Sequence, residues 1–306
     1  AITGGTDRRI CVWNLETGQT DRVLTGHTGW VLAVTVIGDG RRAVSAGRDE
    51  TLRVWNLDTG VVERALRGDM GCVWTVAVTP DGRRAISGGD DGRLCVWNLD
   101  TGTMERKLTG HKGTVHSITV TPDGRRAITG GTDRRICVWN LETGEVERIH
   151  TGHEGGVECV TVTPDGRRAI TGGTDGRICI WDLDTGQTKQ TVAGRLGGVS
   201  AAAVTPDGRR VVFGGTNGRL RISNLGKGSI EWLLTGHVGG VSVVVATPDG
   251  RAISGGANGR LRIWNLKTGQ AERTLTGHTG GVSVVMVTPD GQRVISGGTM
   301  GKLRVW

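Results

Sequence analysis

Hydrophobic and polar positions form short segments along the whole chain, and no segment repeats its apolar residues at the spacing of a helix. Residues 115–120 (Val-His-Ser-Ile-Thr-Val) are rich in β-branched side chains, and residues 125–130, 135–141 and 146–150 form three further segments. Turn sequences separate these segments. In Thr-Pro-Asp-Gly at 121–124, the proline fixes φ and the glycine accepts a positive φ. This pattern predicts short β-strands and an all-β protein.

The four segments recur with a period of about 42 residues, and residues 1–18 reappear unchanged as 127–144. A tryptophan marks the third segment of nearly every repeat, with Ser223 in the one remaining place: Trp13, Trp55, Trp97, Trp139, Trp181, Trp264 and Trp306. A single sheet of four strands cannot bury both of its faces, whereas repeats stacked side by side can. The period therefore predicts a β-propeller of four-stranded antiparallel blades.

The number of blades is open at this stage. The first strand of the repeat occurs seven times, whereas residues 1–13 and 294–306 are equivalent pieces of one repeat. We expect seven blades, the last of which takes its outer strand from about residues 19–25. The alternative is eight blades, one without its inner strand and another without its outer strand. We also expect residues 1–306 to form a single domain. Because the first residue is alanine, we expect that domain to be excised from a longer protein.

Three motifs recur at fixed places. Gly-His precedes the first strand, an Asp follows the second strand, and Trp-Asn ends the third strand, with a literal Trp-Asp only at 181–182. In these motifs the chain resembles the WD40-repeat β-propeller family, in particular bacterial members with nearly identical repeats. The resemblance covers all 306 residues. It implies a buried set of four hydrogen-bonding residues in each blade. The complete sets are His27, Ser45, Asp49 and Trp55; His111, Thr129, Asp133 and Trp139; and His153, Thr171, Asp175 and Trp181.

Some repeats have lost members of this set. One repeat has Asp69 in place of the histidine, and Asn258 and Met300 replace the turn aspartate in two others. A further repeat lacks all four members and carries Arg195, Phe213, Asn217 and Ser223 instead. We expect packing alone to hold this last blade together, and we expect it to be the weakest or the most specialised blade.

Charge raises the question of nucleic acid as a partner, because the net charge is +8 and the pI is about 9.7. The arginines recur in pairs after an Asp-Gly turn, so acidic residues are interleaved with them, and no aromatic platform lies beside them. We therefore expect a solvated basic rim, and a nucleic-acid platform is the alternative. The pairs are Arg41-Arg42, Arg83-Arg84, Arg125-Arg126, Arg167-Arg168 and Arg209-Arg210.

Composition excludes several other classes of protein. No apolar run has the length of a membrane span, so we expect no membrane partner. The six cysteines include no Cys-x-x-Cys, and four of them occupy one place in the third strand, which predicts buried apolar side chains and a cytoplasmic protein. His116 and His150 have no second ligand at metal-binding spacing. We therefore expect no metal and no cofactor.

A histidine that recurs in every blade is structural, because one catalytic site does not repeat around a molecule. We therefore predict that the chain is not an enzyme. We expect a monomeric, non-catalytic scaffold or sensor that binds a protein or peptide, and the remote alternative is a propeller-type enzyme or lectin.

The binding site is expected where near-identical repeats differ. The residue before the first Val of the first strand is Gly in four repeats, and the residue after that Val is Ser in three. Other repeats carry larger residues there. The resemblance implies that these positions line the wide opening around the central channel, where the alternative role of the tryptophans is to plug it. The predicted partner-binding residues are Trp30, Leu32, Trp74, His116 and Glu158, with Arg48 and Asp90 as a polar rim.

Overall fold

The structure is a computed structural model that describes residues 1–306 apart from 15, 18, 39, 69–70, 194–196, 228, 289–292 and 300–302. The described residues form β-strands and turns, and none of them lies in a helix. The strands make eight antiparallel sheets. The chain divides into two compact units, Ala1–Thr151 and Gly152–Trp306, with four sheets in each.

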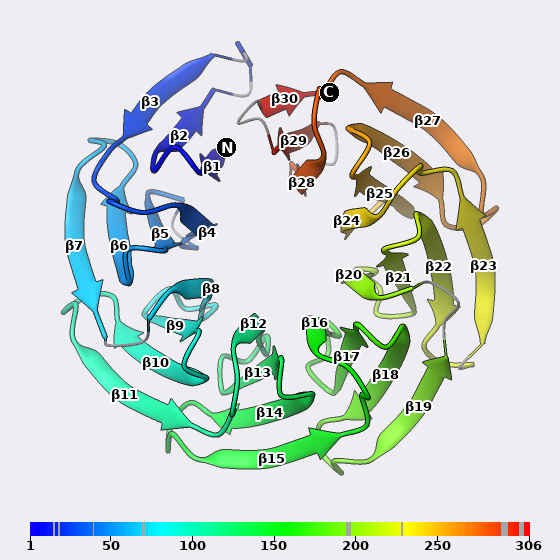
Figure 1. Ribbon diagram of the computed structural model, residues 1–306, viewed down its shortest axis with the longest axis horizontal. Coiled ribbons are helices and arrows are strands. Elements are labelled where there is room, and N and C mark those ends of the chain that lie inside the picture. Colours follow the sequence, from blue (N-terminus) through cyan, green and yellow to red (C-terminus); the bar gives the residue numbers. More distant parts are fainter. Residues whose placement is uncertain are drawn as a thin grey trace. The chain divides into compact units, whose positions relative to one another are not determined.

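The first unit contains one sheet of three strands and three sheets of four strands (Figure 1). The three-stranded sheet comprises β1 (Ile2–Gly4), β2 (Ile10–Trp13) and β3 (Thr20–Leu24). The four-stranded sheets are β4 (Val31–Val36), β5 (Arg42–Gly47), β6 (Thr51–Asn56) and β7 (Val62–Arg67); β8 (Val73–Val78), β9 (Arg84–Gly89), β10 (Arg93–Asn98) and β11 (Met104–Thr109); and β12 (Val115–Val120), β13 (Arg126–Gly131), β14 (Arg135–Asn140) and β15 (Val146–Thr151).

The second unit contains three sheets of four strands and ends on a sheet of three. The four-stranded sheets are β16 (Val157–Val162), β17 (Arg168–Gly173), β18 (Arg177–Asp182) and β19 (Thr188–Ala193); β20 (Val199–Val204), β21 (Arg210–Gly215), β22 (Arg219–Asn224) and β23 (Ile230–Thr235); and β24 (Val241–Ala246), β25 (Arg251–Gly256), β26 (Arg260–Asn265) and β27 (Ala271–Thr276). The last sheet is β28 (Val282–Val287), β29 (Val294–Gly298) and β30 (Leu303–Val305).

The prediction of seven blades is wrong, and the alternative of eight is confirmed. Strand β3 pairs with β2, in the register Trp13 to Thr20, and does not complete the sheet of β28–β30. The first sheet therefore lacks the inner strand and the last sheet lacks the outer strand. The physical reason is local: the Asn14 side chain accepts hydrogen bonds from the amides of Glu16 and Thr17, which closes the same short hairpin as in the other repeats. A short hairpin costs less loop entropy than a pairing between distant segments.

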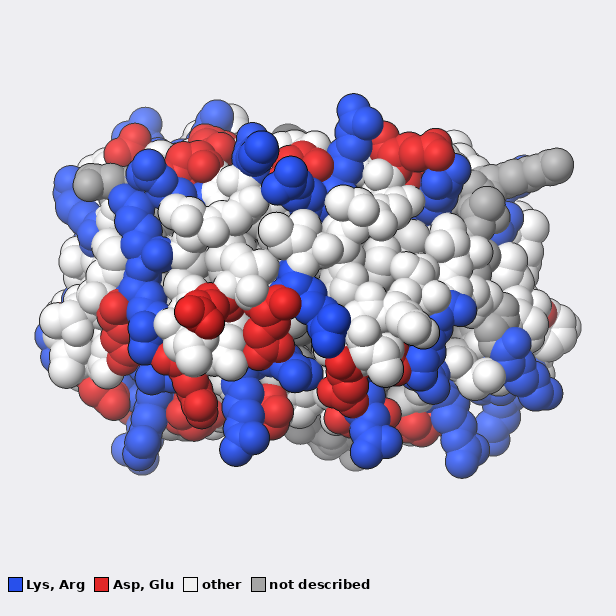
Figure 2. All heavy atoms as spheres, turned by 90° about the horizontal axis from the view of Figure 1, so that it is seen from below, with Lys and Arg blue, Asp and Glu red and all other residues white. Residues whose placement is uncertain are grey.

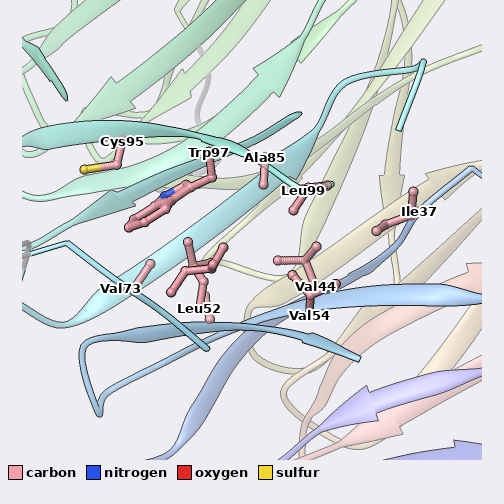
Figure 3. Close-up of a cluster of buried hydrophobic side chains, with 11 residues drawn as sticks. Ile37, Val44, Leu52, Val54, Val73, Ala85, Cys95, Trp97 and Leu99 are labelled. Carbon is pink, nitrogen blue, oxygen red and sulfur yellow. The ribbon is translucent and has the colours of Figure 1, made fainter. Parts of the chain in front are cut away.

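Apolar side chains from neighbouring sheets fill the space between them. Between the sheets β4–β7 and β8–β11, Leu52 and Val54 face Val73 and Trp97 (Figure 3). Full burial of an aliphatic side chain of this kind contributes about 1.5–3 kcal/mol. The next pair of sheets, β8–β11 and β12–β15, approach closely at Gly88, where an added Cβ would lie 2.8 Å from Val115 Cγ1. Each sheet is therefore held by its neighbours.

The first strands of successive sheets contact one another within each unit. In the first unit β4 contacts β8, and β8 contacts β12 (Figure 1). The residues at the starts of these strands therefore come from distant parts of the sequence but lie on neighbouring sheets. This arrangement positions the candidate site.

Candidate functional site

The three complete hydrogen-bond sets lie within single sheets and are buried. In the first set, His27 Nδ1 lies 2.9 Å from Asp49 Oδ2, His27 Nε2 lies 2.6 Å from Ser45 Oγ, and the Trp55 indole donates to the same hydroxyl at 2.8 Å. The other two sets have the same geometry, with Thr129 or Thr171 as the hydroxyl: His111, Thr129, Asp133 and Trp139; and His153, Thr171, Asp175 and Trp181.

One proton arrangement satisfies the whole set. The Trp55 N–H donates to Ser45 Oγ, the Ser45 hydroxyl donates to a neutral His27 Nε2, and the His27 Nδ1–H donates to Asp49. Burial lowers the pKa of His27, in keeping with a neutral ring. Hydrogen bonds from Thr51, Thr28 and His27 lower the pKa of Asp49, although burial alone would raise the pKa of this carboxyl group. The set is therefore a structural chain of donors and acceptors.

The sheet of β20–β23 is built without this chain of hydrogen bonds. Phe213 takes the place of the hydroxyl residue and is completely buried. Ser223 takes the place of the tryptophan and is buried opposite Val211 in the pairing of β21 with β22. An apolar ring thus replaces a polar network. Residues Asp69, Arg195 and Met300, which replace set members in the sequence, lie outside the described residues.

Set members are also missing around His237. Its Nε2 keeps the contact with Ser254 Oγ at 2.7 Å, and Trp264 donates to the same hydroxyl at 2.8 Å. Asn258 replaces the turn carboxylate. Burial and, to a smaller extent, the Arg262 charge lower the pKa of His237 to about 4.

Most of the predicted partner-binding residues meet in the first unit. The guanidinium carbon of Arg48 lies 4.8 Å from the centre of the Trp30 ring, as in a cation–π contact. The Trp74 indole donates a hydrogen bond to the Asp90 carboxylate and packs edge-on against the His116 ring, with 6.1 Å between ring centres. These contacts come from three neighbouring sheets, β4–β7, β8–β11 and β12–β15.

Cys72 joins the two halves of this group. Its carbonyl accepts a hydrogen bond from the Asp90 amide at 3.1 Å, and its thiol interacts with the Arg48 side chain. Burial, opposed by the Arg48 contact, raises the pKa of the Cys72 thiol. We define the aromatic cluster as Trp30, Arg48, Cys72, Trp74, Asp90 and His116.

The other two predicted residues lie apart from these contacts. Leu32 follows Trp30 by two residues and is half-buried in β4. Glu158 is half-buried in β16 and belongs to the second unit. The cluster therefore rests on residues of the first unit alone. Trp30 is the more exposed of its two tryptophans, at 45% exposure.

Glu50, whose charge acts on the Cys72 thiol, is a residue that the sequence analysis missed. Its φ is +62°, a left-handed conformation that strains a residue with a Cβ. Arg8 and Arg134 share this conformation and turn position, whereas glycine occupies it at 92, 176, 218 and 259. The three strained residues all belong to the first unit. A comparison of the residues at this turn position between repeats would have identified the three strained residues.

The recurring arginine pairs are largely compensated by acidic partners. The second arginine of a pair commonly forms an ion pair with a glutamate of the fourth strand, as Arg84 does with Glu105 at 2.8 Å and Arg126 with Glu147 at 2.8 Å. On the face shown in Figure 2, basic and acidic side chains lie side by side along both edges. No group of three metal-ligating side chains occurs among the described residues. Nor does any helix in that part of the chain have the length and apolar character of a membrane span.

Repeated antiparallel sheets, three of which are built around a complete His-Asp-Ser/Thr-Trp hydrogen-bond set, define the chain as a WD-repeat β-propeller. Comparison with family models agrees. The model described as "IFT122 first beta-propeller" matches residues 72–306, and the model described as "WD domain, G-beta repeat" matches residues 18–56. The chain therefore belongs to this β-propeller family. No curated protein matches the chain.

Proposed function

We propose that this chain is a non-catalytic scaffold that binds a protein or peptide segment at the aromatic cluster. WD-repeat propellers generally serve as scaffolds for protein interactions. The observation that supports this site is the contact between Trp30 and Arg48, which holds a half-exposed aromatic ring on a surface where most other repeats have glycine. Aromatic and arginine side chains of this kind dominate the binding energy of protein interfaces.

The chemistry of the cluster favours a segment with an apolar anchor. The Trp30 and Trp74 rings offer apolar area, while Arg48, Glu50 and Asp90 provide charges of both signs around them. The contacts between these residues fix the ring positions before a partner arrives, which reduces the entropy lost on binding. The strained backbone at Glu50 supports the same assignment, because strain of this kind concentrates at functional sites.

Two other functions have less support. A hydrolytic triad is disfavoured because the His, Asp and Ser or Thr side chains recur as buried sets in several sheets. A nucleic-acid platform is disfavoured because arginines of the recurring pairs contact glutamates of their own sheets.

The test selects binding peptides from a random display library on the immobilised protein and measures their affinity by fluorescence anisotropy. The double variant Trp30→Ala/Trp74→Ala should bind at least about thirtyfold more weakly, because a hot-spot truncation costs about 2 kcal/mol or more. Trp232→Ala is the matched control, since Trp232 on β23 is 40% exposed but lies in the second unit. Equal affinity of the double variant and the wild type would show that the cluster is not the site. Far-ultraviolet circular dichroism verifies that all variants are folded.

A further inference from the structure

One groove in the second unit differs in charge from its counterparts. In four repeats the arginine that begins the second strand forms an ion pair with a glutamate of the fourth strand. The contacts are Arg84–Glu105 and Arg126–Glu147, both at 2.8 Å, and Arg210–Glu231 and Arg251–Glu272, both at 2.7 Å. At Arg168 the corresponding fourth-strand residue is Lys189. A cation thus replaces the anion beside this arginine.

Lys189 is neutralised by a second substitution in its own sheet. Its Nζ lies 2.6 Å from Asp182 Oδ2, where other repeats carry asparagine. Asp182 is therefore committed to Lys189. Among the described residues, the structure shows no ion pair for Arg168. Arg168 therefore lacks the ion pair that its counterparts form, although the Asp165 carboxylate, which lines the same cavity, interacts with its charge.

The turn of the next sheet has also lost its acidic residue. Five other repeats carry Glu or Asp followed by Thr in this turn, and Arg42 reaches one of them across the sheets, with Nη1 3.5 Å from Asp100 Oδ1. The turn after β22 instead contains Gly226 and Lys227. Arg168 Nη1 donates to the Leu225 carbonyl at 2.7 Å, which directs the guanidinium toward this turn.

The groove between these two sheets has room for a ligand. Two cavities of about 330 and 440 Å³ share Arg168 and Gly226 in their lining. Arg209 and Asp165 border the smaller cavity, and Lys189 and Lys227 border the larger one. The sheets involved, β16–β19 and β20–β23, are neighbours within the second unit (Figure 1).

The acidic groups near the groove have partners of their own. The Asp165 carboxylate accepts hydrogen bonds from the Thr163 hydroxyl and the Arg167 amide within its turn. Glu231 is paired with Arg210. Lys227 is exposed, and Arg168 keeps the remaining N–H groups of its planar fork. The donors to Asp165 are neutral and leave its negative charge in place. With Lys189 and Asp182 paired, the charges of Arg168, Arg209 and Lys227 less that of Asp165 leave an excess of about two positive charges in the groove.

We propose that this groove binds a doubly charged phosphate group. A guanidinium fork together with flexible ammonium groups matches the several oxygens of a phosphate dianion. The site is independent of the aromatic cluster, because its residues belong to the other unit. The phosphate can be a free ion or a phosphate monoester, and both present the same group to Arg168.

The test titrates inorganic phosphate into the protein by isothermal calorimetry at constant low ionic strength, and then repeats the titration with O-phosphoserine as a monoester. We expect saturable binding in the millimolar range or tighter for at least one of them. The probe that binds with the higher affinity identifies the natural ligand as a free phosphate ion or a phosphate monoester. Absence of saturable binding with both probes would overturn the proposal.

The repeats themselves provide the variant and its control. Asp182→Asn/Lys189→Glu/Lys227→Thr installs residues that other repeats use at these places, so it should fold. We expect this variant and Arg168→Gln to lose at least about tenfold in affinity. Lys107→Glu on β11 lowers the net charge as much as the triple variant and should bind like the wild type. Similar losses in Lys107→Glu and the triple variant would show that general charge attraction, and not this groove, explains the binding.

Discussion

Lys189 Nζ lies 2.6 Å from Asp182 Oδ2, across the hairpin that joins β18 to β19. In five other repeats an asparagine and a glutamate fill these two places, with the asparagine Nδ2 donating at 2.8–3.0 Å. The asparagine or aspartate Oδ1 also accepts the amides of the turn. Both positions have therefore changed together. The anion Asp182 replaces the neutral asparagine, and the cation Lys189 replaces the glutamate.

The exchange predicts strong coupling between the two residues. Lys189→Glu alone places a carboxylate beside Asp182 and should destabilise the fold by about 1–3 kcal/mol, because a buried polar group loses its partner. Asp182→Asn/Lys189→Glu restores the arrangement of the other repeats and should recover the wild-type stability to within about 0.5 kcal/mol. Urea unfolding of the single and double variants measures the coupling. Additive losses in the double variant would contradict it.

The same pair predicts a dependence of stability on pH. The Lys189 ammonium and the Thr185 amide hold the pKa of Asp182 well below its usual range. Because the pKa is lower in the folded than in the unfolded chain, the pair stabilises the fold above about pH 4 and this contribution is lost as the pH falls further.

We therefore expect the stability difference between the wild type and Asp182→Asn to be largest near neutral pH and to shrink below about pH 4. Thermal unfolding of both proteins at several pH values measures this difference. A difference that stays constant down to the acid limit of the fold would show that the carboxylate charge is not what stabilises this hairpin.

A buried hydrogen-bond set predicts a cost for removing its histidine. His111→Ala leaves Thr129 and Asp133 without their ring partner and should destabilise the fold by about 1–3 kcal/mol. His116→Ala is the control, because His116 is half-buried and belongs to no such set. It should change the stability by less than about 0.5 kcal/mol. Similar shifts of the urea midpoint in the two variants would argue against a structural role for the set.

The resemblance to the WD40-repeat family implied the hydrogen-bond sets, because the residues that carry it, such as His111, Thr129, Asp133 and Trp139, recur at fixed spacing in the sequence. The number of blades was not predictable in this way, since residues 1–13 and 294–306 have equivalent sequences. Only the pairing of β3 with β2 decides it. Counting the strands of each type in the sequence does not show that a strand pairs more readily within a local hairpin than with a distant segment.

The candidate site was also predicted in part. Trp30, Trp74 and His116 stood out because other repeats carry small residues at the same places. Their contacts with Arg48 and Asp90 depend on three neighbouring sheets. Cys72 and Glu50 were missed as site residues because their roles depend on a side-chain contact with Arg48 and on a backbone angle, neither of which the sequence displays.

The strained turn at Glu50 leads to the last prediction. Its φ of +62° is one that glycine adopts without cost, so Glu50→Gly should stabilise the fold by up to about 1 kcal/mol. The neighbouring sheet offers the reverse change as a control. Gly92 has a φ of +74°, and an added Cβ there would lie 2.7 Å from the His111 carbonyl oxygen, so Gly92→Ala should destabilise the fold.

If the strained backbone at Glu50 serves peptide binding, relieving the strain should weaken that binding. We therefore expect Glu50→Gly to weaken the binding of peptides selected on the aromatic cluster while it raises the urea midpoint, because the Glu50 carboxylate and the backbone that positions it are both altered beside Cys72. Gly92→Ala should lower the urea midpoint. If Glu50→Gly gains stability and keeps full affinity, the turn is a tolerated irregularity and Glu50 does not belong to the binding surface.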